Sequence, residues 1–146
     1  MQATIRRAAP QDAARLLELC RLLSVGDEPD LALEAARQRL RATADDPDHA
    51  VYVAESDGRI VGTFALVLVA GLAHGGRPFG IVEDVAVDPS AQGQGVGKQL
   101  MRFAMDRCAE RGCYKLALSS RLSREPAHRF YESLGFEKHG FSFMVS

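Results

Sequence analysis

The spacing of apolar residues along the chain predicts short strands and helices in alternation. Residues 4–8 alternate between polar and apolar positions, which indicates a first strand. After Pro10, leucines recur at helical spacing, which predicts a helix that ends by Gly26. A second helix is expected to begin at residues 27–30 and to end before Asp45. The N-terminal third of the chain is therefore predicted to be one strand followed by two helices.

The rest of the chain shows the two-residue alternation of strands, interrupted by two further helical patterns. We predict strands at 50–55, 60–70, 79–87 and 114–119, and helices at 96–111 and 126–134. A hairpin turn at 56–59 joins the first two of these strands, and a glycine-rich loop occupies 71–78. Gly135 is expected to end the last helix. Final strands are expected around Phe136 and at 141–145.

The run from Val85 to Lys98 combines a buried strand, a turn and a glycine-rich helix start. Gly93, Gly95 and Gly97 lie at alternate positions and carry no Cβ that would keep a diphosphate away from the backbone. The first N–H groups of a helix lack partners inside it, and the helix dipole adds about half a positive charge there. We therefore predict a pyrophosphate site formed by the backbone of Gln92, Gly93, Gln94, Gly95, Val96, Gly97 and Lys98.

The glycine spacing excludes two common phosphate sites. A dinucleotide fingerprint needs G-x-G-x-x-G, whereas Gly93, Gly95 and Gly97 give G-x-G-x-G. A P-loop needs a longer gap between its glycines, and Gln99 occupies the position of the magnesium-binding hydroxyl. The spacing that fits is Gln/Arg-x-x-Gly-x-Gly/Ala after a Val-x-Val-x-Pro strand.

This motif, together with a second one, resembles the GNAT superfamily of acyl-CoA-dependent N-acyltransferases. The second motif, A-x-x-F-Y-x-x-x-G-F, stands at residues 127–136, and the resemblance extends over residues 50–140. It implies an α/β (α+β) fold with a mixed, mostly antiparallel central sheet flanked by helices. The sheet is expected to open where the strand at 79–87 parts from its neighbour, with acetyl-CoA in the gap.

The resemblance also implies which residues bind acetyl-CoA. The backbone of Val85, Ala86 and Val87 is expected to pair with the pantetheine amides like another strand, and to polarise the thioester oxygen. The valine side chains are expected to pack in the core. Further contacts are expected at Ser120, Arg124, Ala127, Phe130 and Tyr131.

Three cationic side chains are candidates for binding an anionic substrate group or the 3′-phosphate of CoA: His74, Arg121 and Arg124. The alternative is that they are solvated surface cations. His128, on the predicted helix at 126–134, is expected at the surface or at the rim of the cofactor site.

Tyr131 is the candidate acid, because the family assigns this tyrosine position to protonating or stabilising the CoA sulfur. A phenol with a pKa of about 10 faces a thiol with a pKa of about 8.5, so full proton transfer is uphill by roughly 2 kcal/mol in water. A hydrogen bond to the sulfur in the transition state is therefore expected to matter more than complete transfer. The alternative is a half-buried core tyrosine whose hydroxyl faces water.

Glu83 is the candidate base or ammonium-binding residue. Amines with a pKa near about 10 arrive as ammonium ions, so a carboxylate can remove the proton directly or through water. Alternation sends the neighbouring carboxylates Glu83 and Asp84 to opposite faces of the strand. The same alternation places Glu83 in phase with Val85 and Val87. Asp84 is the alternative base, and a solvated or paired carboxylate is the third interpretation.

Two parts of the chain resemble different members of the superfamily. Residues 81–87 and 112–115 are similar to glucosamine-6-phosphate N-acetyltransferases, but Ser119 and Ser120 stand where those enzymes have an acidic residue. Residues 118–143 are more similar to bacterial small-amine enzymes such as aminoalkylphosphonate N-acetyltransferases. We expect an N-acetyltransferase that acts on a primary amine of a small molecule by direct attack. The alternatives are acetylation of a protein N-terminus or lysine, and a non-catalytic acyl-CoA-binding module.

Composition and charge limit the choice of partner. With 146 residues, 47% of them hydrophobic, the chain is expected to form a single domain spanning residues 1–146. Its 18 basic and 19 acidic residues form no like-charged block, so neither a nucleic acid nor a membrane is expected as a partner. We expect a small-molecule amine as the partner, and a homodimer.

The cysteines and the apolar runs bear on location. Cys20, Cys108 and Cys113 are odd in number and lack a C-x-x-C spacing, so we expect reduced core thiols, with neither a disulfide nor a metal. The first residues hold no apolar signal segment, and the longest apolar run, Phe64 to Ala70, is too short to span a bilayer. We therefore expect a cytoplasmic protein.

Overall fold

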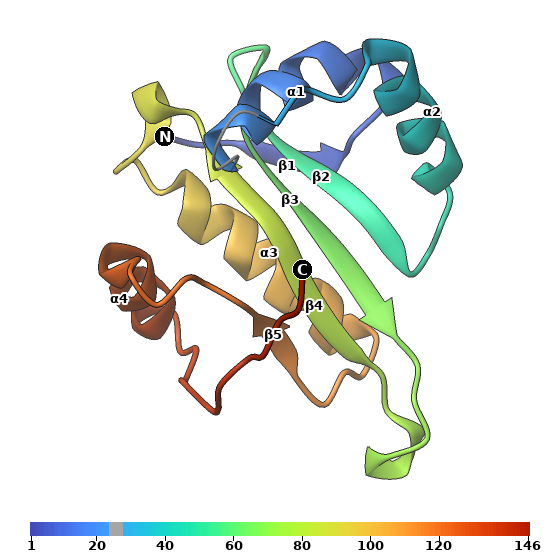
Figure 1. The fold of residues 1–146 in the computed structure, drawn as a ribbon, viewed down its shortest axis with the longest axis vertical. Helices are drawn as coiled ribbons and strands as arrows, with labels where there is room; N and C mark the ends of the chain where they lie inside the picture. The colour runs from blue at the N-terminus through green and yellow to red at the C-terminus, as the bar shows by residue number, and fades with distance from the viewer. Residues whose placement is uncertain (24–27) are drawn as a thin grey trace.

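The computed structural model of the chain describes residues 1–23 and 28–146. These residues form a five-stranded sheet in the order β1-β2-β3-β4-β5 (Figure 1). Strands β1 to β4 run antiparallel to one another in succession, and β5 is parallel to β4. The strands are β1 Thr4–Arg7, β2 His49–Ser56, β3 Arg59–Val69, β4 Phe79–Val87 and β5 Leu116–Leu118. This mixed, mostly antiparallel sheet confirms the predicted fold class.

Helices flank the sheet. The α-helices of the described residues are α1 Ala13–Cys20, α2 Leu33–Thr43, α3 Val96–Glu110 and α4 Glu125–Ser133. Short 3-10 turns are η1 Pro10–Asp12, η2 Arg21–Leu23, η3 His74–Gly76 and η4 Pro89–Ala91. In the part of the chain that the structure describes, no helix has the length and the apolar character needed to cross a bilayer.

α1 and α2 cover one face of the sheet, and α3 covers the other (Figure 1). Val53 of β2 packs with Leu19 of α1 and Leu40 of α2. Its neighbour Tyr52 points to the opposite face, because side chains alternate along a strand, and packs there with Phe64 in the core beneath α3. Each face of the sheet thus buries the apolar side of the helices that cover it.

The sheet opens beyond the end of β5. The pairing of β5 with β4 extends only as far as Val82 and Leu118, while β4 continues to Val87. After Leu118 the chain leaves the sheet towards α4 (Figure 1). The outer edge of residues 83–87 therefore has no pairing with β5, and the predicted opening beside this strand is confirmed.

The C-terminal end differs from the expectation. The predicted strand at 114–119 is reduced to Leu116–Leu118. The strands expected around Phe136 and at 141–145 are wrong, since the structure has no strand in that segment of the described residues. An alternating apolar pattern forms a strand only where a neighbouring strand accepts hydrogen bonds from its N–H groups and donates to its C=O groups. Four large apolar side chains remain exposed there instead: Phe141, Phe143, Met144 and Val145.

The helix predicted after Pro10 is present as η1, α1 and η2 in succession. Its predicted end at Gly26, and the predicted start of the next helix at Asp27, lie outside the described residues. The second helix ends at Thr43, which agrees with the prediction.

The three cysteines differ in burial. Cys108 is buried and Cys113 is half-buried, but Cys20 is exposed. α1 buries Leu16 and Leu19 and leaves Cys20, its last residue, outside the core. The expectation of a core thiol is therefore wrong for Cys20.

Candidate active site

A β-bulge interrupts β4 at the candidate base. The register with β3 shifts after Glu83, so Asp84 and Val85 together occupy one position of the ladder. Asp84 has a φ of 55°, which is uncommon for a residue other than glycine. A bulge of this kind bends a strand and re-aims its side chains. The alternation of β4 is therefore not continuous.

The bulge changes which side chains share a face with Glu83. Beyond it, Ala86 is in phase with Glu83, and Ala86 packs in the core beneath α1 and α2. Val85 and Val87 pack against the core on the α3 side. The expectation that Glu83 lies in phase with these two valines is therefore wrong, whereas their predicted packing against the core is confirmed.

The second carboxylate, Asp84, lies near the end of α1. Partial desolvation, followed by the negative charge of Asp84, raises the pKa of the Cys20 thiol. The Cys20 thiol at the end of α1 is therefore within electrostatic range of Asp84. Glu83, in phase with Ala86, is on the face that α1 and α2 cover, and both carboxylates are exposed.

The glycine-rich turn joins β4 to α3 through η4. Gly95 is the N-cap of α3 with a φ of 85°, and a Cβ added there would meet nothing within 4 Å. The first hydrogen bond that returns to this cap runs from the Gln99 N–H to the Gly95 oxygen, at 3.1 Å. The N–H groups of residues 96–98 therefore have no partner inside the helix, and no described side chain caps it. The turn is suited to an anion such as a diphosphate.

Gly97 is explained differently from Gly95. A Cβ at Gly97 would lie 3.2 Å from Cζ of Phe130 on α4, which is tighter than ordinary van der Waals contact. The absent side chain therefore makes room for Phe130. Packing against Phe130 is thus a second reason for the glycine at this position, and the Gly97 N–H lies in the first turn of α3.

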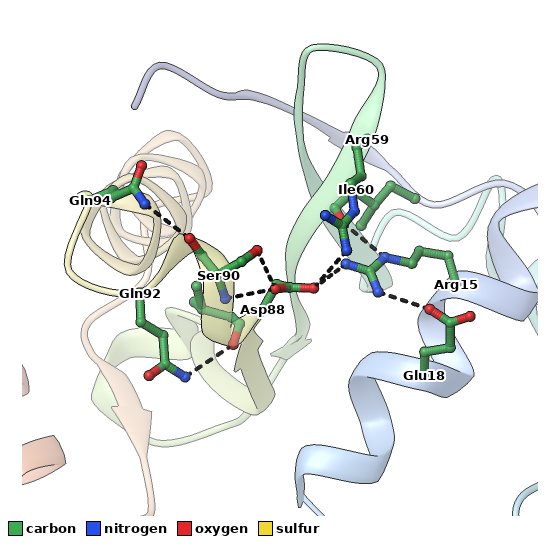
Figure 2. Close-up of polar contacts among 9 residues, drawn as sticks. Arg15, Glu18, Arg59, Ile60, Asp88, Ser90, Gln92 and Gln94 are labelled. Carbon is green, nitrogen blue, oxygen red and sulfur yellow. Dashed lines mark hydrogen bonds and ion pairs between the residues drawn. The ribbon is translucent and has the colours of Figure 1, made fainter.

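Asp88, at the end of β4, is a residue that the sequence analysis missed. It is buried, and its carboxylate accepts hydrogen bonds from the Ser90 N–H at 2.8 Å and the Ser90 hydroxyl at 2.6 Å. Arg15 of α1 and Arg59 of β3 approach it at 2.5 and 3.2 Å (Figure 2). The bonds from Ser90 and the Arg15 guanidinium hold the pKa of Asp88 well below its usual range. The only local signal was Asp-Pro-Ser, a common start of a turn.

The glutamines of the loop bond back to the loop itself. Nε2 of Gln92 donates to the Val87 oxygen at 3.3 Å, and Nε2 of Gln94 donates to the Ser90 oxygen at 3.0 Å (Figure 2). Both side chains therefore act on carbonyl groups and occupy no N–H group of the turn, of which the Gln92 N–H donates to the Pro89 oxygen at 3.4 Å. This supports a backbone cradle rather than a side-chain site.

Tyr131 is half-buried on α4, between two aromatic rings. The Phe130 and Phe136 rings lie 5.3 and 5.9 Å from its own, centroid to centroid. The Phe136 N–H returns to the Tyr131 oxygen at 3.1 Å, with Gly135 in the left-handed conformation that ends α4 as predicted. Burial raises the pKa of the phenol, and the charge of Arg124 acts in the opposite direction. Tyr131 is thus protonated at neutral pH, and its hydroxyl has no hydrogen-bond partner among the described residues.

The other predicted cofactor residues lie around α4. Ser120 has a buried hydroxyl oxygen without a hydrogen-bond partner in the described part of the chain. Arg124 is the exposed N-cap of α4, and Ala127 and Phe130 are half-buried on this helix. Since Phe130 packs on Gly97, these residues adjoin the first turn of α3.

The cationic candidates do not form one group. His74 stacks on Tyr114 at 3.9 Å between ring centroids, just before β5, whereas Arg121 and Arg124 follow β5. His74 therefore lies at the other end of this strand. Nε2 of His128 is 2.7 Å from the Arg121 oxygen and must donate to it, because a carbonyl only accepts.

Comparison with known proteins identifies the family of the chain. The model of the acetyltransferase (GNAT) family matches residues 12–136. A glucosamine 6-phosphate N-acetyltransferase of Trypanosoma brucei brucei is 42% identical over 89 residues, which are 61% of this chain and 58% of that protein. The match therefore spans less than two thirds of that relative.

Two bacterial relatives match almost the whole chain. An aminoglycoside N(6′)-acetyltransferase type 1 of Stenotrophomonas maltophilia is 34% identical over 92% of this chain and 86% of its own length. An aminoalkylphosphonate N-acetyltransferase of Salmonella typhimurium is 29% identical over 95% of this chain and 88% of its own length.

The fold is shared with solved structures. A protein of Agrobacterium tumefaciens superposes with a TM-score of 0.90 at 30% identity, over 98% of this chain and 99% of the other. The family match covers both motifs that carry the resemblance found in the sequence, and the mixed sheet is that of the family. The chain therefore belongs to the GNAT family of acetyltransferases and is an acyltransferase.

Proposed function

We propose that the chain, as a single domain spanning residues 1–146, transfers the acetyl group of acetyl-CoA to a primary amine of a small molecule by direct attack. The observation that carries the proposal is the first turn of α3, where the N–H groups of 96–98 have no partner inside the helix. This turn adjoins α4, the helix that carries Tyr131. The relatives that act on amino sugars, aminoglycosides and aminophosphonates support an amine acceptor of this size.

When bound, acetyl-CoA supplies an activated acetyl thioester. The turn at 92–98 would hold the diphosphate through backbone N–H groups, and the outer edge of residues 85–87, which β5 leaves unpaired, would bind the pantetheine amides. The unpartnered hydroxyl of Ser120 would gain a hydrogen bond. The charge of Asp88 is offset by two guanidinium groups, so it does not oppose an anion at the turn. On α4 the contacts would come from Arg124, Ala127, Phe130 and Tyr131.

A carboxylate at the bulge takes the proton of the acceptor. An amine with a pKa of about 10 is mostly ammonium at neutral pH and cannot attack until it loses a proton. We assign this step to Glu83, directly or through one water, with Asp84 as the alternative. The amine nitrogen then bonds to the carbonyl carbon, and the bond between that carbon and the sulfur breaks. The first proton stays on the carboxylate, and the second proton, which the nitrogen loses as it becomes an amide, passes to the departing thiolate.

Tyr131 stabilises the leaving sulfur. Its phenol is protonated, because burial raises its pKa, and its hydroxyl is without a partner among the described residues. A hydrogen bond from this hydroxyl to the developing thiolate would strengthen as the carbon–sulfur bond breaks. Phe130 and Phe136 fix the ring on either side.

A panel of amines tests the function. Phosphonates, amino sugars, polyamines, amino acids and aminoglycosides are incubated with the protein and acetyl-CoA, and the released thiol is measured. Turnover with at least one small amine is expected. Turnover with peptide amines only would favour acetylation of proteins, and no turnover with either, despite binding of acetyl-CoA, would contradict the catalytic assignment.

We further propose a cytoplasmic homodimer, without a nucleic acid or a membrane as partner. The support for the dimer is the exposed apolar segment at 141–145, where Phe143 is 95% exposed. Exposed apolar surface of this kind is favoured at sites of protein association. A second copy of the chain would bury it.

A further inference from the structure

We infer that Arg15 and Asp88 position the glycine-rich turn and thereby link the affinity for acetyl-CoA to helix α1. The inference rests on the proposed function, because it requires the turn at 92–98 to be the acetyl-CoA site. Both residues are positioning residues, since neither is placed to contact the reacting atoms.

The two oxygens of Asp88 have separate partners. Oδ1 accepts hydrogen bonds from the N–H and the hydroxyl of Ser90, at 2.8 and 2.6 Å, and so holds the start of the turn. Oδ2 accepts hydrogen bonds from the guanidinium groups of Arg15, at 2.5 Å, and Arg59, at 3.2 Å. One carboxylate therefore joins the turn to α1 and to the start of β3 (Figure 2).

Arg15 is the stronger of the two cationic partners. Its Nε donates to the Ile60 oxygen at 3.0 Å and its Nη1 pairs with Glu18 at 2.9 Å, while Nη2 reaches Asp88 (Figure 2). The planar fork is thus fixed on three sides. The Arg15 side chain is 22% exposed, whereas that of Arg59 is 60% exposed and makes a single, longer contact. Water screens the Arg59 pair more strongly.

The anchor acts on a turn whose backbone is least restricted at two glycines, although the side chains of Gln92 and Gln94 and the Met1 ammonium group also bond to carbonyl groups of this segment. Between Ser90 and the first turn of α3, Gly93 and Gly95 both have positive φ, and a Cβ on either would meet nothing within 4 Å. Glycine in such a segment has wide conformational freedom when it is released. A site whose N–H groups are already ordered binds more tightly than one that must be ordered on binding.

Asp88→Asn removes the charge of Asp88 and keeps the size of its side chain. An amide has the shape of the carboxylate, but one of its two ends carries only donors. That end must face either the Ser90 N–H or the two guanidinium groups, which are donors too. The variant therefore loses one half of the anchor without creating a cavity.

The experiment compares three variants. Asp88→Asn and Arg15→Gln are each expected to raise Kd and KM for acetyl-CoA about tenfold, the usual size of coupling between sites, with kcat at saturating acetyl-CoA within about twofold of wild type. The control is Arg41→Gln, which removes an exposed pair with Glu34 on α2 and should change neither constant. Calorimetry gives Kd, and steady-state kinetics separate KM from kcat.

Amide hydrogen exchange provides the second measurement. The hydrogen-bonded amides of Ser90, Ala91 and Gln92 should exchange faster in Asp88→Asn and Arg15→Gln than in wild type, and at the wild-type rate in Arg41→Gln. If Asp88→Asn does not fold, Arg15→Lys carries the test, because lysine keeps the charge but cannot reach Ile60 and Asp88 together.

The outcomes separate the two proposals. Wild-type protein that does not bind acetyl-CoA would overturn the proposed function and this inference with it. Wild-type protein that binds acetyl-CoA, with unchanged Kd and unchanged exchange in folded Asp88→Asn and Arg15→Gln, would overturn the inference alone. A loss of kcat with unchanged KM would also overturn it, because positioning of the cofactor turn acts on binding.

Discussion

The ring of Phe130 occupies the place that a side chain at Gly97 would need, since a Cβ there would lie 3.2 Å from its Cζ. This contact joins α4 to the first turn of α3. Tyr131 is the next residue along α4, and its ring lies 5.3 Å from that of Phe130. The packing of one glycine against one ring thus helps to hold the helix that carries the candidate acid.

We predict that Gly97→Val destabilises the fold by about 1–3 kcal/mol, because it overpacks this contact. Phe130→Ala in the same chain removes the ring, so the double variant should lose less stability than the sum of the two single changes. Free energies of unfolding in urea give the comparison. Additive losses would show that residues 97 and 130 do not touch in solution.

Gly95→Val should weaken the binding of acetyl-CoA at least tenfold while the fold survives. The valine adds backbone strain of about 1–2 kcal/mol and places a side chain where the diphosphate is expected. Gly58→Val is a matched control, because Gly58 also has a positive φ, 75°, with nothing within 4 Å of an added Cβ, but lies in the β2–β3 turn. Calorimetry should show a loss for Gly95→Val only, and equal losses in both variants would argue against the cradle.

Tyr131→Phe should lower kcat by about 10 to 10⁴-fold with little change in KM for acetyl-CoA. The ring keeps its packing with Phe130 and Phe136, and only the hydrogen bond to the leaving sulfur is lost. Tyr114→Phe, at the other end of β5, serves as the control. A kcat for Tyr131→Phe within twofold of wild type, when chemistry limits the rate, would mean that Tyr131 is a packing residue.

Glu83→Gln should be slow at neutral pH and should recover at high pH, where solvent has already deprotonated the amine. In wild-type protein, kcat/KM for the amine should rise with pH as carboxylate and free amine become available. A variant with the wild-type pH profile would transfer the role to Asp84, which Asp84→Asn then tests. A variant that is equally slow at every pH would show that Glu83 orients the acceptor instead.

The contribution of Asp88 to stability should disappear in acid. Its pKa is lowered in the folded protein, so its contribution is present above the unfolded pKa of about 3.9 and is lost as the pH falls through the folded value. The difference in unfolding free energy between wild type and Asp88→Asn should therefore shrink when the pH is lowered from 7 to 3. A constant difference would mean that the ionisation of Asp88 does not contribute to stability.

Elements with strong local signals were predictable from the sequence. The bounds of β4 and the start of α3 agree with the prediction, because apolar runs and glycine or proline residues delimit them. The bulge at Asp84 was missed, since it depends on pairing with β3 and not on the residues of β4. The pair of Arg15 and Asp88 was missed for a similar reason, because 73 positions separate its members.

In the C-terminal segment the sequence predicted strands that the structure does not contain among the described residues. Residues 141–145 have the alternation of a strand, but a pattern states only which side chains favour burial and not what covers them. The exposed rings of Phe141 and Phe143 show that the rest of the described chain does not provide that cover.

The extra residue at Asp84 inverts the alternation of the later residues of β4, so each of them faces the side of the sheet opposite to the one it would face in a regular strand. Besides the side chains, it decides which N–H and C=O groups of residues 85–87 point towards β3 and which point towards the open edge. Removing one residue there would exchange those two sets while leaving the composition of the strand almost unchanged. The hydrogen-bonding pattern offered to a ligand at this edge is thus determined by how many residues the strand contains, and only secondarily by which ones.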